Sequence, residues 1–199
     1  SEMCIRDSMN TVPKRLAALR AAMAANGVAV YLIPVGDPHA SEYLPCHYTS
    51  LTWFSGFHGE NSNFVVTRTE SALWADGRYF VQAEKEIAGT EIKLQRMGEP
   101  GVPTVEEYCA NALNEGEALG LCGLTASTAL VNDLKKALEK KGASIKTLNL
   151  EDELWTEGRP ARPATPAWIL PKEYAGFSPA EKLERLRGNC LLYTSDAAD

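Results

Sequence analysis

A polar cluster, Asp37-Pro38-His39-Ala40-Ser41-Glu42-Tyr43, directly follows an apolar, β-branched segment at residues 28–34. Because open α/β sheets bind ligands at the carboxyl ends of their strands, this cluster could form a binding edge that includes Asp37 and His39. An equally good interpretation is that Asp37 and Ser41 cap the next helix, with Glu42 in its first turn.

A second cluster, Trp74-Ala75-Asp76-Gly77-Arg78-Tyr79-Phe80, stands where a strand is expected to turn into a helix. We expect Gly77 to permit that turn and Arg78 to project from the strand end. The planar guanidinium group of Arg78 could bind a carboxylate or a carbonyl oxygen. From local sequence alone, an ion pair from Arg78 to Asp76, Asp37 or Glu42 is slightly favoured over ligand binding.

Other catalytic chemistry has weak support in the sequence. There is no HExxH, GxSxG or Walker motif, and the three histidines, His39, His47 and His58, do not have metal-ligand spacing. A metal site that combines them with Asp37 or Glu42 is therefore not favoured. Cys46 beside His47 could be a thiol nucleophile, but without an activating partner at defined spacing a half-buried structural cysteine is favoured.

The composition is that of an ordinary folded protein. The chain has 199 residues, 45% of them hydrophobic, and a net charge of −6 from 20 Lys and Arg against 26 Asp and Glu. Since no stretch concentrates basic residues, a nucleic-acid surface is not expected, and no apolar run is long enough to span a membrane. The five cysteines form no CxxC pair, which suits a reducing, cytoplasmic location.

Expected strands and helices alternate along the chain. A helix should begin at residues 11–13 and end at Asn26-Gly27, and hydrophobic periodicity predicts further helices at residues 78–87, 104–113 and 127–139. Expected strands lie at residues 28–34, 63–67, 71–75, 91–97, 118–122 and 143–148, the second and third forming an antiparallel hairpin. The sequence therefore predicts an α/β fold with a mixed β-sheet flanked by helices.

The two ends differ from the sequence between them. Residues 1–8 (SEMCIRDS) and 190–199 (CLLYTSDAAD) resemble translations of the transposase adapters used to build sequencing libraries. We expect an N-terminal domain at residues 9–157, followed by a stiff, proline-rich linker at residues 158–177. Ser178-Pro179-Ala180-Glu181 predicts a capping box and a helix to Gly188, so residues 178–189 should begin a truncated middle domain.

Five segments resemble landmarks of one family. They are IPVGDPHASEYL (residues 33–44), WFSGFHG (53–59), LWADGRYFVQAEKEI (73–87), MGEPGVPT (97–104) and LWTEGRPARP (154–163). In order and spacing they resemble the N-terminal domain of Xaa-Pro aminopeptidases, of the creatinase/prolidase group. This resemblance covers essentially all of residues 9–189, and the combination of DPHxSEY with DGRYF is specific.

The resemblance implies a ribonuclease H-like mixed sheet and a substrate-binding role for Arg78. We expect Asp37, His39 and Tyr79 to line the cleft or an interface. The family releases the N-terminal residue from peptides with proline in second position. Two divalent metals, often manganese, belong to a pita-bread catalytic domain that follows a middle domain in the longer members. We therefore expect no cofactor or metal in this chain, which should be inactive alone, and its own missing domains and a homodimer as partners.

Two departures from the family pattern affect these expectations. Residues 58–63 replace a stretch of small residues, and Glu157-Gly158-Arg159-Pro160 carries an inserted glycine, which leaves the linker geometry open. The domain could also belong to a prolidase or a creatinase-like hydrolase, or it could be a free-standing α/β binding module. The coding sequence downstream of Asn189 would distinguish these alternatives.

Overall fold

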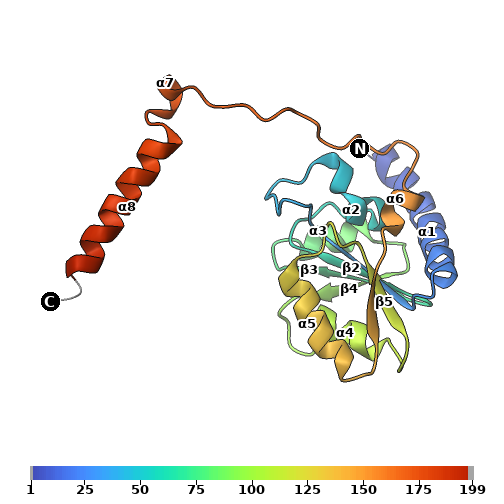
Figure 1. Cartoon of the computed structure of the whole chain (residues 1–199). Coiled ribbons are helices and arrows are strands. Elements are labelled where there is room, and N and C mark those ends of the chain that lie inside the picture. The colour runs from blue at the N-terminus through green and yellow to red at the C-terminus, as the bar shows by residue number, and fades with distance from the viewer. Residues whose placement is uncertain (1, 197–199) are drawn as a thin grey trace. The chain divides into compact units, whose positions relative to one another are not determined.

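The computed structural model describes the backbone of residues 2–196 and the side chains of residues 11–190 (Figure 1). The chain forms two compact units, Ser1–Pro163 and Ala164–Asp199, each of which is described by itself. No helix within residues 2–196 combines the length and the apolar character that crossing a bilayer requires.

A six-stranded mixed sheet forms the centre of the first unit, in the order β4-β3-β2-β1-β5-β6. β2 pairs antiparallel with both β1 and β3, whereas the pairs β1–β5, β3–β4 and β5–β6 are parallel. This arrangement confirms the predicted hairpin and the mixed α/β fold. The strands are β1 (Val30–Pro34), β2 (Asn63–Thr67), β3 (Ser71–Ala75), β4 (Ile92–Arg96), β5 (Ala118–Leu121) and β6 (Ser144–Thr147).

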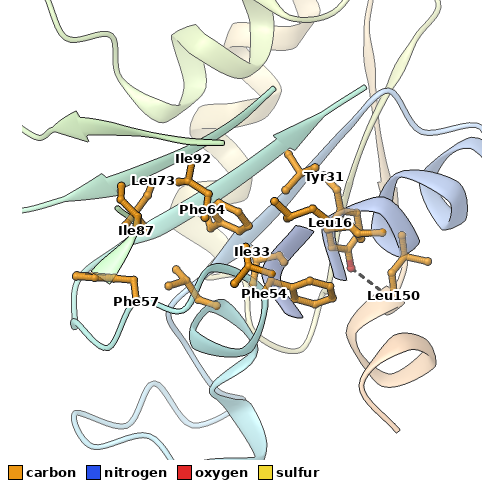
Figure 2. Packing of buried hydrophobic residues seen from close by; sticks show 14 of the residues in the cluster. Leu16, Tyr31, Ile33, Phe54, Phe57, Phe64, Leu73, Ile87, Ile92 and Leu150 are labelled. Carbon is orange, nitrogen blue, oxygen red and sulfur yellow. Dashed lines mark hydrogen bonds between the residues drawn. The ribbon is translucent and has the colours of Figure 1, made fainter. Parts of the chain in front are cut away.

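Helices cover both faces of the sheet, because the central strands are apolar on both sides. Tyr31 and Ile33 face one layer, and Val30 and Leu32 face the other, as the two-residue period of a strand requires. The first layer, shown in Figure 2, contains α1 (Glu2–Ala25), α2 (Ser50–Ser55), α3 (Phe80–Glu86) and α6 (Leu150–Leu154). The second contains α4 (Val105–Asn111) and α5 (Thr128–Glu139). Each large side chain buried between the layers contributes about 1.5–3 kcal/mol.

Local interactions set several of the helix ends. Thr104 and Glu107 form a complete capping box at the start of α4, and the Ser127 hydroxyl accepts a hydrogen bond from the backbone N–H of Leu130 at the start of α5. Gly27, after the end of α1, has a φ of 64°, the left-handed conformation expected of a helix stop.

Other expectations need correction. α1 begins at Glu2 rather than at residues 11–13, so Pro13 lies inside the helix, where its lack of an N–H group leaves one backbone hydrogen bond unmade. No helix starts at Ser41. Neither α2 nor α6 was predicted, since with six and five residues they are too short to show a hydrophobic period. The structure shows a cap at the start of α6: the Asn149 side chain accepts a hydrogen bond from the backbone N–H of Asp152.

The second unit contains two helices, α7 (Lys172–Ala175) and α8 (Pro179–Asp196). The predicted capping box of α8 is present: the Ser178 N–H donates to Glu181, and the Glu181 N–H donates to the Ser178 hydroxyl. α8 continues past Gly188, because residues 189–196 contain neither Gly nor Pro to stop it. Of the expected linker, residues 158–163 fall in the first unit.

Candidate functional site

The sheet register brings both polar clusters to one edge. Pro34, at the end of β1, pairs with Asn63, at the start of β2, and Asn63 pairs with Trp74 near the end of β3. The loops that begin at Asp37 and Asp76 therefore leave the sheet at the same edge. The end of β5 lies there too, because β5 runs parallel to β1.

Asp37 organises the first loop rather than facing solvent. Its side chain is buried, and its Oδ1 atom accepts hydrogen bonds from the backbone N–H groups of His39 and Ser41, both at 2.9 Å. The N–H of Ser41 is the main cause that holds the pKa of Asp37 below its usual value. Asp37 thus caps a turn instead of a helix, and the side chain of His39 is exposed.

Gly36 lets this loop approach the segment after β5. A Cβ atom on Gly36 would lie 2.5 Å from the carbonyl oxygen of Thr125, so no larger residue fits without a shift of the backbone. A cavity of about 680 Å³ lies between this loop, residues 61–63 and residues 123–130. Its polar lining includes Asp37, Ser41, Asn61, Thr125 and Ser127.

Arg78 forms an ion pair with Asp76, which is one of the three acidic partners that the sequence allowed. The Arg78 Nη2 atom lies 2.7 Å from Asp76 Oδ2, and Nε donates to both carboxylate oxygens. The hydrogen bonds from Arg78 are the main cause of the lowered pKa of Asp76. The Nη1 group makes no hydrogen bond with any residue that the structure describes, and 66% of the Arg78 side chain is exposed.

Gly77 does not have the role expected from the sequence. Its φ angle is not positive, and a Cβ atom there would meet only Phe80, at 3.9 Å. The turn is instead stabilised by Asp76, because its Oδ1 atom accepts from the backbone N–H of Arg78 at 2.9 Å.

The loop at residues 56–62 packs against the Arg78 turn, which sequence reasoning did not predict. The Asn61 side chain donates to Asp76 Oδ2 at 3.1 Å, and the Tyr79 hydroxyl donates to Glu60 at 3.4 Å. The Tyr79 ring also lies edge-on to Phe57. The structure thus brings Arg78 and Tyr79 together with the loop that departs from the family pattern, whereas the Asp37 carboxylate bonds within its own loop.

The histidines do not come together as a metal site. His58 lies 3.5 Å from Glu86, His39 is exposed, and His47 is buried against the segment after α6. Among the described residues, no group of three His, Cys, Asp or Glu side chains could hold a metal ion. Cys46 is exposed, not half-buried as expected from the sequence.

The sequence did not predict that the carboxyl group of Glu151 is buried. The Tyr31 hydroxyl, in β1, donates to Glu151 Oε2 at 2.5 Å and accepts from the N–H of Leu150 at 3.2 Å (Figure 2 shows the bond to Leu150). Glu151 is 3% exposed, and burial raises its pKa to about 7. The only hint in the sequence was a tyrosine inside an otherwise aliphatic strand.

This fold and the sequence between residues 15 and 154 match the creatinase/prolidase N-terminal domain. The chain belongs to that family. Aminopeptidase P2 of Arabidopsis thaliana is 37% identical over 185 residues, which is 90% of this chain and 26% of that protein. The chain spans about a quarter of the length of the curated relatives that it matches.

Solved structures agree with this assignment. The crystal structure of X-prolyl aminopeptidase from Caenorhabditis elegans, described as a cytosolic enzyme with a di-nuclear active site, matches with a TM-score of 0.77 and 31% identity. The match covers 92% of this chain and 31% of that one. The N-terminal domain of the cytoplasmic peptidase PepQ from Mycobacterium tuberculosis matches with a TM-score of 0.52 and 25% identity, over 71% of this chain and 98% of that one.

Proposed function

We propose that this chain is the non-catalytic N-terminal domain of a Xaa-Pro aminopeptidase, which releases the first residue of peptides with proline in second position. Family membership and the names of its relatives support this proposal. The relatives that match at 37% and 40% identity, from Arabidopsis thaliana and Sordaria macrospora, are named as an aminopeptidase P and a probable Xaa-Pro aminopeptidase P. Those names favour an aminopeptidase over a prolidase or a creatinase-like hydrolase.

The observation that carries the proposed role in substrate binding is the orientation of Arg78. Asp76 binds the Nε and Nη2 side of the guanidinium group, while the Nη1 side stays open. Holding a flexible side chain in place reduces the entropy lost when a ligand binds. Because Asp76 also balances the charge, Arg78 would recognise a peptide oxygen through a directed hydrogen bond.

The neighbouring residues would shape the same cleft. Tyr79 supports Arg78, whose guanidinium carbon lies 5.3 Å from the centre of the Tyr79 ring. Asp37 fixes a loop that presents the exposed His39 at the same sheet edge. We assign these three residues to the cleft or to an interface of a homodimer, with the chain's own middle and catalytic domains as further partners.

The metal centre would lie outside this chain. The nematode relative is described as having a di-nuclear active site, and the described residues here include no suitable ligand cluster. We therefore place two divalent ions, with manganese as the proposed metal, in the catalytic domain of the complete enzyme. This chain alone would be inactive, and the cytosolic relative supports a cytoplasmic location.

The test uses an enzyme in which this domain is joined to its middle and catalytic domains. Losing a charge-assisted hydrogen bond costs about 1.5–3 kcal/mol, so Arg78→Ala should lower kcat/KM about 10- to 150-fold, with the melting temperature nearly unchanged. Arg78→Lys should restore only part of this loss, since lysine keeps the charge but not the fork.

A matched control is Arg68→Ala. Arg68 is also an exposed arginine in an ion pair, 2.6 Å from Glu117, but it lies between β2 and β3 at the opposite edge of the sheet. This variant should keep normal kinetics. If Arg78→Ala lowers the melting temperature and leaves kcat/KM unchanged, Arg78 is a structural ion-pair residue and its proposed role is wrong.

A further inference from the structure

An arginine binds the segment after α6 to the rest of the first unit, although its proline-rich composition predicts a stiff, extended linker. Arg159 pairs with Asp152, with Nη1 and Oδ1 2.5 Å apart, and its Nε and Nη2 groups both donate to the carbonyl oxygen of His47 at 3.2 Å. Only 10% of the Arg159 side chain is exposed. Gly158, just before it, has a φ of 67° and turns the chain toward these partners.

His47 binds the same segment with both ring nitrogens. Its Nδ1 atom lies 2.7 Å from the carbonyl oxygen of Pro160, and its Nε2 atom lies 3.3 Å from the Nε group of Arg162. A carbonyl oxygen only accepts and an arginine only donates, so these two contacts assign the ring proton of His47 to Nδ1 and leave Nε2 as the acceptor. Arg162 also pairs with Asp152, at 2.8 Å.

Stacked side chains extend this attachment into the core. Trp155 is 7% exposed and stacks on Trp53, with ring centres 5.6 Å apart and planes 17° apart. Arg159 lies 5.1 Å from the centre of the Trp155 ring, and Arg15 of α1 lies 4.2 Å from that of Trp53. Residues far apart in the sequence thus support one another, and arginine–tryptophan contacts of this kind are favourable.

We infer that His47, Asp152, Arg159 and Arg162 form a latch that holds residues 155–163 on the first unit as a strap. The latch fixes the point at which the chain leaves this unit, close to Pro163 instead of Trp155. A shorter flexible linker raises the effective concentration, at the surface of the first unit, of the part of the chain that follows the linker. The strap lies beyond residue 154, where the match to the creatinase/prolidase N-terminal domain ends, and the inference does not depend on the proposed function.

The tautomer of His47 gives a direct test in the unaltered chain. Long-range ¹H–¹⁵N spectra at alkaline pH, where imidazole is neutral, should show the proton of His47 on Nδ1. His39 and His58 are internal references, because neither makes this pair of contacts. A proton on Nε2 of His47 would overturn the inference, whatever the outcome of the kinetic test of Arg78.

Backbone order supplies the second test. ¹⁵N relaxation should give order parameters near those of rigid backbone, about 0.85, for the amides of residues 156–159, 161 and 162, and Arg159→Ala should lower them below about 0.6. Arg159→Lys should give intermediate values, because it keeps the charge without the fork. Arg68→Ala, which removes an arginine paired elsewhere, should match the unaltered chain.

Two results would contradict the latch. One is order parameters below about 0.6 for the strap in the unaltered chain. The other is an order profile that Arg159→Ala leaves unchanged. If Arg159→Ala does not fold, the unaltered chain and Arg159→Lys still decide the question.

Discussion

At the scale of single residues, the first unit buries an acid where an apolar side chain would be expected. Glu151 lies in the first turn of α6, a position that suits a negative charge, yet the layer between α6 and β1 excludes water from it. Its raised pKa of about 7 shows that burial outweighs the hydrogen bond from Tyr31, which acts in the opposite direction. The native structure therefore favours the protonated form of Glu151.

This preference predicts a pH dependence of stability. The folded chain holds the proton of Glu151 more tightly than the unfolded chain, in which the carboxyl group has its ordinary pKa of 4.5. The contribution is therefore complete below about pH 4.5 and is lost as the pH rises toward 7, by on the order of 2–3 kcal/mol. Urea unfolding at pH 5 and pH 8 should show this loss, and Glu151→Gln should abolish that part of it.

Glu153→Gln is the control for this measurement. Glu153 lies on the same helix but is exposed, so its substitution should leave the pH dependence as it is. Equal pH slopes for the unaltered chain and Glu151→Gln would show that Glu151 is not the group responsible.

At the scale of elements, helix ends are set by short-range hydrogen bonds. The Thr104 hydroxyl accepts from the N–H of Glu107 at 3.2 Å, and the Glu107 carboxylate accepts from the N–H of Thr104 at 3.0 Å. These two bonds satisfy donors that the first turn of α4 would otherwise leave unpaired. α4 then places Val105 and Cys109 against the sheet.

Removing this cap should destabilise the first unit by a modest amount. Thr104→Ala should cost about 1 kcal/mol, which corresponds to about 2–4 °C in the melting temperature of a chain of this size. Thr104→Ser keeps the accepting hydroxyl and should cost much less. Equal losses in the two variants would mean that the threonine methyl group, and not the cap, provides the stability.

At the scale of the whole molecule, the buried side chains among the described residues begin at Val12 and belong to the first unit. In the second unit, large apolar side chains such as Trp168, Ile169 and Tyr174 are exposed. The cooperative stability of this chain should therefore come from the two packed layers of the sheet.

Removing residues from both ends should consequently have little effect on the melting temperature. A chain restricted to residues 9–189 should melt within about 2 °C of the full chain, because a loss below about 0.5 kcal/mol shifts the melting temperature of a chain of this size by no more than that. Differential scanning calorimetry of the two chains measures this difference. A loss of several degrees would show that residues 1–8 or 190–199 contribute to the fold, against their expected origin as adapter translations.

The sequence by itself determined the features that depend on near neighbours. Hydrophobic patterns predicted all six strands and the helices α1, α3, α4 and α5, and a hydroxyl and a carboxyl group three residues apart predicted the cap of α8. The same reasoning located the two polar loops at strand ends. Such signals are readable because propensity, capping and periodicity act over a few residues.

Only the tertiary structure decided which distant side chains meet. Local sequence left three carboxylates open as partners of Arg78, and the structure selects Asp76. His47 and Pro160 are 113 residues apart, and Tyr31 and Glu151 are 120 residues apart. No local pattern encodes such pairs, because they form only when packing brings the layers together, and burial then decides which hydrogen bonds must be made and which carboxyl groups keep their proton.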